Sequence, residues 1–340
     1  MTGGRLARDS RGRKSRGGER RTVEGGFARA FLNRLAGDGG RDDFRRMETR
    51  SGKTLVIFGC GYVGREVARQ ALARGLRAIA LTRNEAKAAE LRAAGVEVVV
   101  GDLASSAWHA QIAGPVELAL NCVSSGGGGI EGYRRSYAEG MTSVLAWAKV
   151  RGAVGTLVYT SSTSVYPQGG GVRVDETAPT DSTAERARIM VEAETQLREN
   201  AGACGRWFVL RLAGIYGPGR HHLIDQVRSG EVSGRADHHL NLAHLDDICA
   251  AVWAVFDAPP TVANKIFNVA DDAAATKAEV VAWLAARLGL PVPHFTGTQA
   301  EGRERLTPDR IIANDNLQAA LGWRPRHASF RSGYEKLLSR

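Results

Sequence analysis

The stretch TLVIFGCGYVGREVA, residues 54–68, constrains the fold more than any other part of the chain. An apolar run leads into three glycines spaced G-x-G-x-x-G, at Gly59, Gly61 and Gly64, and a helical pattern follows. In such a unit the first glycine permits a tight turn, the second lets backbone approach a diphosphate, and the third lets the helix pack on the strand. The N–H groups at the start of that helix attract phosphate. The pattern therefore predicts a dinucleotide-binding site.

Short β-branched runs alternate with helical stretches from Thr54 onward. The expected strands cover residues 54–58, 77–82, 96–100, 116–123, 156–160, 207–212 and 265–269. The expected helices cover residues 63–74, 85–94, 133–151 and 183–200. Near-continuous apolar strands that alternate with helices are typical of a parallel sheet covered on both faces. We therefore predict an α/β fold with a Rossmann-like, doubly wound parallel sheet.

The pattern changes after Tyr216, where polar residues with many Gly, His and Arg replace the regular alternation. Helices are expected farther on at residues 246–256 and 277–288 and near Tyr334. We predict an NAD(P)-binding domain over residues 53–215. A smaller C-terminal substrate lobe is predicted over residues 216–340, with one interleaved return strand. The carboxyl edge of an open α/β sheet is where ligands bind, so the substrate lobe is expected over that edge.

The N-terminal segment carries most of the net positive charge. Residues 1–50 hold 14 Lys/Arg against 7 Asp/Glu, which is +7 of the total of +10. Rich in Gly and Arg and poor in large apolar residues, this segment is predicted to be disordered. It is either an appendage or an upstream start, with Met47 as the true beginning. Its first 26 residues contain no aromatic side chain to interleave with bases, so no nucleic-acid partner is expected.

Arg83 stands nineteen residues after Gly64, directly after Thr82 at the end of the second expected strand. An acidic residue at this place binds a ribose 2′-hydroxyl, whereas an arginine accommodates a 2′-phosphate. We therefore expect NADP, with NAD as the second choice and a solvated surface arginine as the structural alternative. Asp102 and Leu103 end the third expected strand, where a carboxylate would bind the adenine amine or cap the next helix.

Three further segments carry a resemblance: YTSSTSVYP at 159–167, RLAGIYGPGR at 211–220 and NLAHLDDICAAV at 241–252. Together with the glycine turn they resemble the extended short-chain dehydrogenase/reductase superfamily, the group of nucleotide-sugar epimerases and dehydratases. The resemblance runs from about Thr54 to the C-terminus and implies a Rossmann fold that carries NAD(P). It implies cofactor contacts at Gly59, Gly61, Tyr62, Val63, Gly64, Thr82, Arg83, Asp102, Leu103 and Val123.

The acid/base pair of that superfamily is missing here. Its chemistry uses a Tyr and a Lys four residues apart on one helix, and a Ser at the preceding strand end. Ser162 matches the serine, but with Glu192 aligned to the usual glutamate, Ala184 takes the Tyr position and Arg188 the Lys position. The usual asparagine position falls near Gly140. This departure resembles the atypical short-chain dehydrogenases, which often carry an arginine on this helix.

The resemblance therefore leaves the proton donor open. We name Ser162, Arg188 and Tyr166 as catalytic candidates. Tyr166 has a structural role as its alternative. Tyr133 and Tyr137, on the helix after the glycine-rich segment 124–129, could also supply a proton, although ordinary packing is the simpler interpretation.

No metal site is expected. Adjacent histidines rarely share one ion, and no Cys or carboxylate stands at a zinc spacing near the doublets His221-His222 and His238-His239. Arg220 and His221 instead favour a small-molecule substrate that is anionic or nucleotide-linked. The cysteines are scattered without a C-x-x-C pair, which is typical of a reducing compartment: Cys60, Cys122, Cys204 and Cys249.

Two classes of function are favoured at this stage, and nucleic-acid binding through the basic N-terminal segment is a third, less favoured one. One is an NAD(P)-dependent oxidoreductase or epimerase/dehydratase-like enzyme with a non-standard acid/base. The other is a non-catalytic NADP-binding sensor or scaffold module. No stretch has the apolar length to span a bilayer, so we expect a cytoplasmic protein without a membrane partner. The sequence assigns no oligomeric state.

Overall fold

The structure is a computed structural model that describes residues 52–152, 154–297 and 308–339. The basic segment 1–50, including Met47, lies outside the described residues, so its predicted disorder stays a prediction. Within the described ranges, no helix combines the length and the apolar character needed to cross a membrane.

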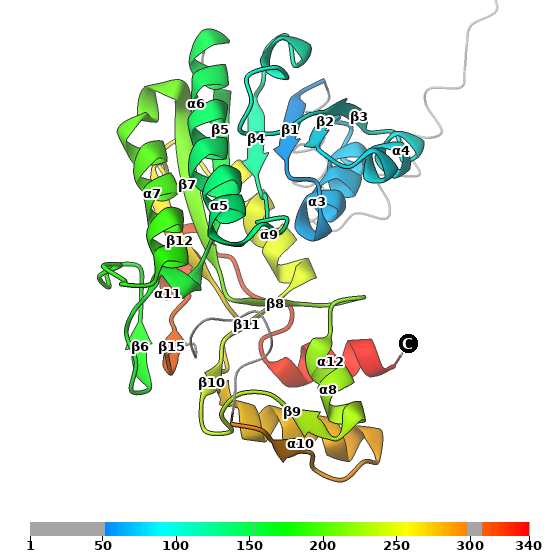
Figure 1. Cartoon of the computed structure of the whole chain (residues 1–340). Helices are drawn as coiled ribbons and strands as arrows, with labels where there is room; N and C mark the ends of the chain where they lie inside the picture. The colour runs from blue at the N-terminus through cyan, green and yellow to red at the C-terminus, as the bar shows by residue number, and fades with distance from the viewer. Residues whose placement is uncertain (1–51, 153, 298–307, 340) are drawn as a thin grey trace, which may run out of the picture. The chain divides into compact units, whose positions relative to one another are not determined.

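Seven parallel strands form the central sheet, in the order β12-β7-β5-β4-β1-β2-β3 (Figure 1). They are β1 (Thr54–Phe58), β2 (Arg77–Thr82), β3 (Glu97–Val100), β4 (Leu118–Asn121), β5 (Val154–Ser162), β7 (Cys204–Leu212) and β12 (Lys265–Val269). Every residue of β1 is buried, because helices cover the sheet on both faces. The Rossmann-like sheet is confirmed. Its strand order reverses between β1 and β4, which places the ligand crevice at their carboxyl ends.

Helices pack on both faces of this sheet (Figure 1). One layer contains α3 (Tyr62–Ala73), α4 (Glu85–Ala93) and α9 (Leu245–Phe256), and the other contains α5 (Gly129–Arg134), α6 (Gly140–Val150) and α7 (Glu185–Glu199). Right-handed crossovers between parallel strands account for α3 and α4 on one face and for α5, α6 and α7 on the other, whereas α9 packs against α3 and lies on the face opposite to α7. The caps are local: the Asn84 side chain accepts the N–H of Lys87 at the start of α4.

The helix between β4 and β5 differs from the prediction at its N-terminus. It begins at Gly129 instead of Tyr133, and a π-helical segment, η2 (Arg135–Glu139), joins α5 to α6. Close packing requires glycine at one position of this helix, because a Cβ at Gly132 would collide with the carbonyl of Gly127. A helical glycine was therefore indistinguishable from a loop glycine in the sequence.

A second hydrophobic core, separate from that of the sheet, lies among α8 (His222–Ser229), α10 (Lys277–Leu288) and α12 (Phe330–Leu338). The short strands pair as β8 (Gly214–Tyr216) with β11 (Leu242–His244), β9 (Glu231–Val232) with β14 (His294–Phe295), β10 (His239–Leu240) with β13 (Ala275–Thr276), and β6 (Val172–Val174) with β15 (Arg310–Ile312). The remaining short elements are η1 (His109–Gln111), η3 (Thr163–Val165), η4 (Ala201–Ala203) and α11 (Asp315–Leu321). The boundary near residue 216 stays a prediction.

Candidate functional site

Each glycine of the turn between β1 and α3 has its own environment. Gly59 has a φ of +83°, and a Cβ there would collide with the backbone of Val123. A Cβ at Gly64 would lie 2.9 Å from both the carbonyl oxygen of Gly59 and the Sγ of Cys122. At Gly61, directly before α3, no atom lies within 4 Å of that position. Packing therefore requires Gly59 and Gly64, whereas Gly61 faces open space at a helix N-terminus, which is suitable for a diphosphate.

Arg83 extends from the carboxyl end of β2 to the glycine-rich segment 124–129 that follows β4. The residue is exposed, and a Cβ at Gly126 would collide with its Nη2 atom. All four glycines from Gly126 to Gly129 have positive φ values, so backbone alone forms this surface. The preceding Thr82 is half-buried, and its Oγ1 accepts the N–H of Asn84 at 3.3 Å. The guanidinium thus lies beside the segment that follows β4, two strands away from β2 in the sheet.

Two residues shortly after β3, the charged Asp102 and the buried Leu103, have different surroundings. Asp102 Oδ1 accepts the N–H of Ala104 at 3.1 Å, and its Oδ2 accepts the Nε–H of Arg135 at 2.8 Å. Burial raises the pKa of Asp102, but these two hydrogen bonds outweigh it and hold the pKa below its ordinary value. Leu103 is buried against Gly140, where a Cβ would lie 2.9 Å from Leu103 Cδ2. The adenine contact of Asp102 stays a prediction.

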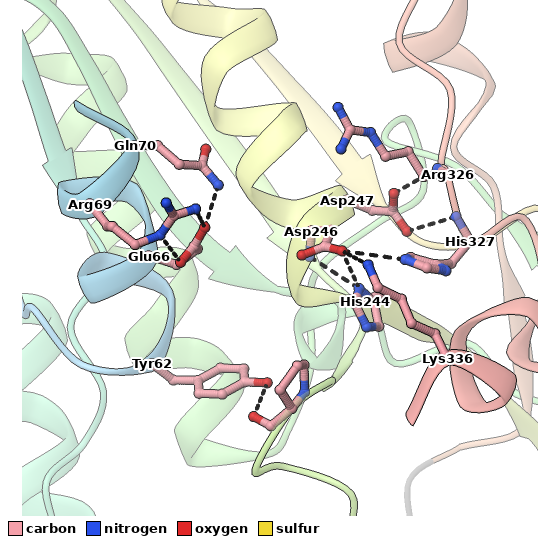
Figure 2. Close-up of polar contacts among 11 residues, drawn as sticks. Tyr62, Glu66, Arg69, Gln70, His244, Asp246, Asp247, Arg326, His327 and Lys336 are labelled. Carbon is pink, nitrogen blue, oxygen red and sulfur yellow. Dashed lines mark hydrogen bonds and ion pairs between the residues drawn. The ribbon is translucent and has the colours of Figure 1, made fainter. Parts of the chain in front are cut away.

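Tyr62 connects the glycine turn to the segment after β8. Its O–H donates to the carbonyl oxygen of Pro218 at 3.0 Å (Figure 2). The guanidinium carbon of Arg220 lies 5.6 Å from the centre of the Tyr62 ring. Burial raises the pKa of Tyr62 to about 12, and Arg220 opposes this effect. Val63, the next residue, is buried under the turn. Tyr62 therefore links the predicted cofactor turn to the segment predicted to line the substrate cleft.

Ser162 ends β5 at the carboxyl edge of the sheet, where the resemblance requires it. Its side chain is half-buried, and its Oγ accepts the N–H of Ser164 at 3.1 Å. Side chains alternate along a strand, so the adjacent Ser161 points to the other face. There its O–H donates to Glu194 Oε1 at 2.6 Å. The two serines thus have separate surroundings.

Tyr166 lies in a buried network and not at an open surface. Its O–H donates to Asn268 Oδ1 at 2.8 Å and accepts from Arg211 Nη1 at 2.9 Å. Arg211 forms a 2.6 Å ion pair with Glu194, and the two side chains are 5% and 4% exposed. Burial raises the pKa of Tyr166, and the charge of Arg211 opposes this. Through these contacts Tyr166 connects the end of β5 to β7 and β12. They favour the structural role that is the alternative to a catalytic one.

The two sides of α7 carry different residues. Ala184 precedes the helix, and Arg188 is exposed. Met190 and Glu194 are buried, and Arg186, one turn before Met190, is half-buried. The guanidinium carbon of Arg186 lies 5.7 Å from the centre of the Tyr133 ring. Arg186 is not found from the sequence when the helix is aligned on the exposed Glu192. Alignment on the buried Glu194 instead places Arg186 eight residues earlier, at the position of the usual Tyr.

The model of the "NAD dependent epimerase/dehydratase family" matches residues 55–270. The chain belongs to this family. The resemblance to extended short-chain dehydrogenases is thereby confirmed.

Among curated proteins, the chain is similar to YeeZ of Escherichia coli, with 31% identity over 189 residues. That match covers 56% of this chain and 65% of YeeZ, so the chain spans about two thirds of that relative's length. It is also similar to a 3-diazoavenalumate denitrifying reductase of a Streptomyces species, at 29% identity over 58% of this chain and 70% of the relative.

Among solved structures, the chain resembles a functionally unknown conserved protein of Silicibacter pomeroyi. The TM-score is 0.67 and the identity is 27%, with 84% of this chain and 98% of the other chain covered.

Membership in the epimerase/dehydratase family names the cofactor class, since that family is NAD dependent. The residues of this chain fit such a cofactor. The open side of Gly61 at the start of α3 leaves room for a diphosphate, and the collisions that a Cβ would make at Gly59 and Gly64 explain why the turn has glycine at both positions.

The two histidine doublets do not assemble into a metal site within the described ranges. His221 Nδ1 lies 3.5 Å from Asp225 Oδ1, and His239 Nδ1 lies 2.9 Å from Asp309 Oδ1. His221 therefore pairs with a carboxylate in the helix that it precedes, His239 pairs with one from a distant segment, and the two pairs are separate.

A buried cluster with ligand-like spacing lies elsewhere in the described structure. His244, Asp247 and His327 each offer one atom, and these atoms lie within 4.8 Å of one another (Figure 2). Both Asp247 oxygens accept backbone N–H groups, from Arg326 at 2.7 Å and from His327 at 3.2 Å. The His244 side chain caps α9 through the N–H of Asp246. Hydrogen bonds that hold residues 326–327 at the start of α9 therefore account for the cluster.

Proposed function

We propose that this protein is an NADP(H)-preferring oxidoreductase that reduces a carbonyl group of a small-molecule substrate. The observation that carries the proposal is the pairing of an open diphosphate turn at Gly61 with an exposed arginine, Arg83, at the end of β2. The similarity to a reductase from Streptomyces supports the reaction class, because that relative is named for a reduction.

The preference for NADP rests on the charge at Arg83. Arg83 is exposed, its guanidinium lies beside backbone glycines, and its charge helps to lower the pKa of Asp102. Its planar donors match phosphate geometry. A charge-assisted hydrogen bond is worth about 1.5–3 kcal/mol, which corresponds to roughly 10- to 150-fold in affinity. We therefore expect NADPH to bind more tightly than NADH by a factor in this range.

The bound cofactor supplies the hydride, and the chain supplies orientation and charge. Ser162 holds the reacting oxygen at the carboxyl end of β5. Of the two arginines in the first turns of α7, Arg186 faces the interior and meets the need for positive charge better than the exposed Arg188. Arg220, which lies over Tyr62, favours an anionic or nucleotide-linked substrate.

Cofactor titration and substrate turnover test the proposal separately. Arg83→Asp should reverse the order of NADPH and NADH affinity, whereas Arg92→Asp in the last turn of α4 should leave the order unchanged. Ser162→Ala should lower turnover of a carbonyl-compound and sugar-nucleotide panel without changing the NADPH dissociation constant. Unchanged cofactor preference in Arg83→Asp refutes the assignment of NADP. A wild-type protein that binds NADPH but reduces nothing in the panel supports the sensor alternative.

We also place the protein in the cytoplasm. None of its four cysteines forms a disulfide, and burial raises the pKa of each thiol. Buried, unpaired thiols are typical of proteins in a reducing compartment.

A further inference from the structure

Two tyrosines lie side by side where the helix after β4 changes from α to π geometry. Tyr133 is in α5 and Tyr137 is in η2, and their ring centres are 4.5 Å apart at an interplanar angle of 47°. Each of the two hydroxyl groups influences the pKa of the other. Tyr133 is half-buried and Tyr137 is buried. Single π-helical turns within α-helices occur frequently at functional sites.

Contacts from Tyr133 place it against the inner side of α7. Its O–H donates to the Sδ of Met190 at 3.4 Å. One helical turn farther along the same side, Glu194 accepts the O–H of Ser161, the residue before Ser162. Helices α5 and α7 both begin at the carboxyl edge of the sheet, because each follows a parallel strand. Tyr133 therefore lies at the edge that binds cofactor and substrate.

The glycine-rich segment brings η2 close to the end of β4. The Oγ–H of Ser136 donates to the carbonyl oxygen of Ser125 at 3.4 Å. Arg83, which we assign to the cofactor, touches the next residue, Gly126. The same segment thus contacts the predicted cofactor site on one side and the tyrosine pair on the other.

The groups around the two tyrosines make Tyr133 easier to ionise than Tyr137. Burial raises the pKa of Tyr133, whereas the hydrogen bond from Tyr137 and the charge of Arg186 act to lower it. Tyr137 is more strongly affected by burial, and the bond to Tyr133 raises its pKa further. Tyr159 of β5 is the other phenol near this pair, and burial raises its pKa well above the ordinary value.

We propose that Tyr133 is the proton donor of this enzyme, with Arg186 stabilising its phenolate and Tyr137 as a positioning residue. This assignment rests on the proposed reductase function. In carbonyl reduction the carbonyl carbon gains a hydride from the reduced cofactor, and the carbonyl oxygen gains a proton. The O–H bond of Tyr133 breaks, an O–H bond forms on the product, and water reprotonates the phenolate. Tyr133 of α5 thus supplies the phenol and Arg186 of α7 supplies the cation. In the superfamily, both groups come from one helix.

Activity measurements with conservative variants form the first test. Tyr133→Phe should lower kcat about 100-fold or more, as loss of an acid/base group does, at an unchanged NADPH dissociation constant. Tyr137→Phe should retain most of kcat but shift the pH profile to higher pH. Arg186→Met should lower kcat, whereas the matched variant Arg198→Met, on the exposed side of α7, should not. Wild-type kcat in a folded Tyr133→Phe protein overturns the assignment while leaving the reductase function intact.

The second test needs no substrate. All seven tyrosines have raised pKa values in the free protein, so no phenol should ionise below about pH 10. The oxidised cofactor carries a positively charged nicotinamide ring, which lowers the pKa of a phenol beside it. Absorbance near 295 nm should show one phenol that ionises at lower pH when NADP⁺ is bound, and Tyr133→Phe should abolish this change. Identical titrations of the wild type and Tyr133→Phe with NADP⁺ overturn the proposal, and absence of NADP⁺ binding overturns the proposed function itself.

Discussion

Asp271, directly after β12 and Ala270, is a buried carboxyl group whose burial is only partly compensated by hydrogen bonding. The residue is 7% exposed, and among the described residues its Oδ2 has no hydrogen-bond partner. Burial and the neighbouring charges of Asp272 and Asp247 raise its pKa from 3.8 to about 8. The phenols of Tyr216 and Tyr334 also face it, and Asp271 adds to the raised pKa of each. Asp271 should therefore be protonated in the native protein at neutral pH.

The way in which Asp271 changes stability with pH follows from the difference between its folded and unfolded pKa values. Between its unfolded pKa near 3.8 and its folded pKa near 8, Asp271 binds a proton in the native state and not in the unfolded state. Its contribution to stability is therefore complete below pH 3.8 and is lost as pH rises to 8. At 1.36 kcal/mol per pH unit, the loss from pH 5 to pH 8 is about 4 kcal/mol. This value is an upper limit if water enters the site.

We expect Asp271→Asn to remove this loss, because an amide of the same shape does not ionise. Urea denaturation, followed by tryptophan fluorescence from pH 5 to pH 9, measures the free energy of unfolding of both proteins. The variant should gain up to about 4 kcal/mol on the wild type between pH 5 and pH 8. Asp181→Asn, at an exposed aspartate, is the matched control and should parallel the wild type. If the Asp271→Asn and wild-type curves also run parallel, the carboxyl is not buried as described.

Two further expectations concern the glycine turn and the buried ion pair. Gly64→Ala should destabilise the fold by about 1–3 kcal/mol, because its Cβ meets backbone at 2.9 Å, whereas Gly61→Ala should leave the urea midpoint unchanged and weaken NADPH binding. Equal stability of the two alanine variants contradicts this distinction. Glu194→Gln should lower the free energy of unfolding by about 3–5 kcal/mol, because Arg211 remains buried without its anion. The control Glu192→Gln, at an exposed position, should lower it by less than about 0.5 kcal/mol in the same urea measurement. A cost below 1 kcal/mol for Glu194→Gln contradicts the ion pair.

The parallel sheet and the glycine turn were accessible from local patterns. Residues 54–58, 77–82 and 265–269 are strands with the predicted bounds, because fully buried parallel strands are continuous apolar runs. The glycine roles at Gly59 and Gly64 follow from sterics within one strand–turn–helix unit, and the structure shows the collisions that they avoid.

The candidate catalytic residues were less accessible, because their environment depends on contacts between distant segments. Arg186 and Arg188 are two residues apart and chemically identical, yet only Arg186 faces Tyr133, since α7 packs with Met190 and Glu194 inward. No periodic pattern distinguishes them when both sides of the helix carry charge.

Sequence alone therefore determined the fold class and the cofactor turn, since both depend on backbone conformation and hydrophobic periodicity within short segments. Packing decided the rest. It brought Tyr133 and Tyr137 of one helix against Arg186 and Met190 of another, and it buried Asp271 beside other carboxylates. These pairings determine which groups are acidic and which are charged, because a pKa depends on neighbours that the chain brings together only on folding.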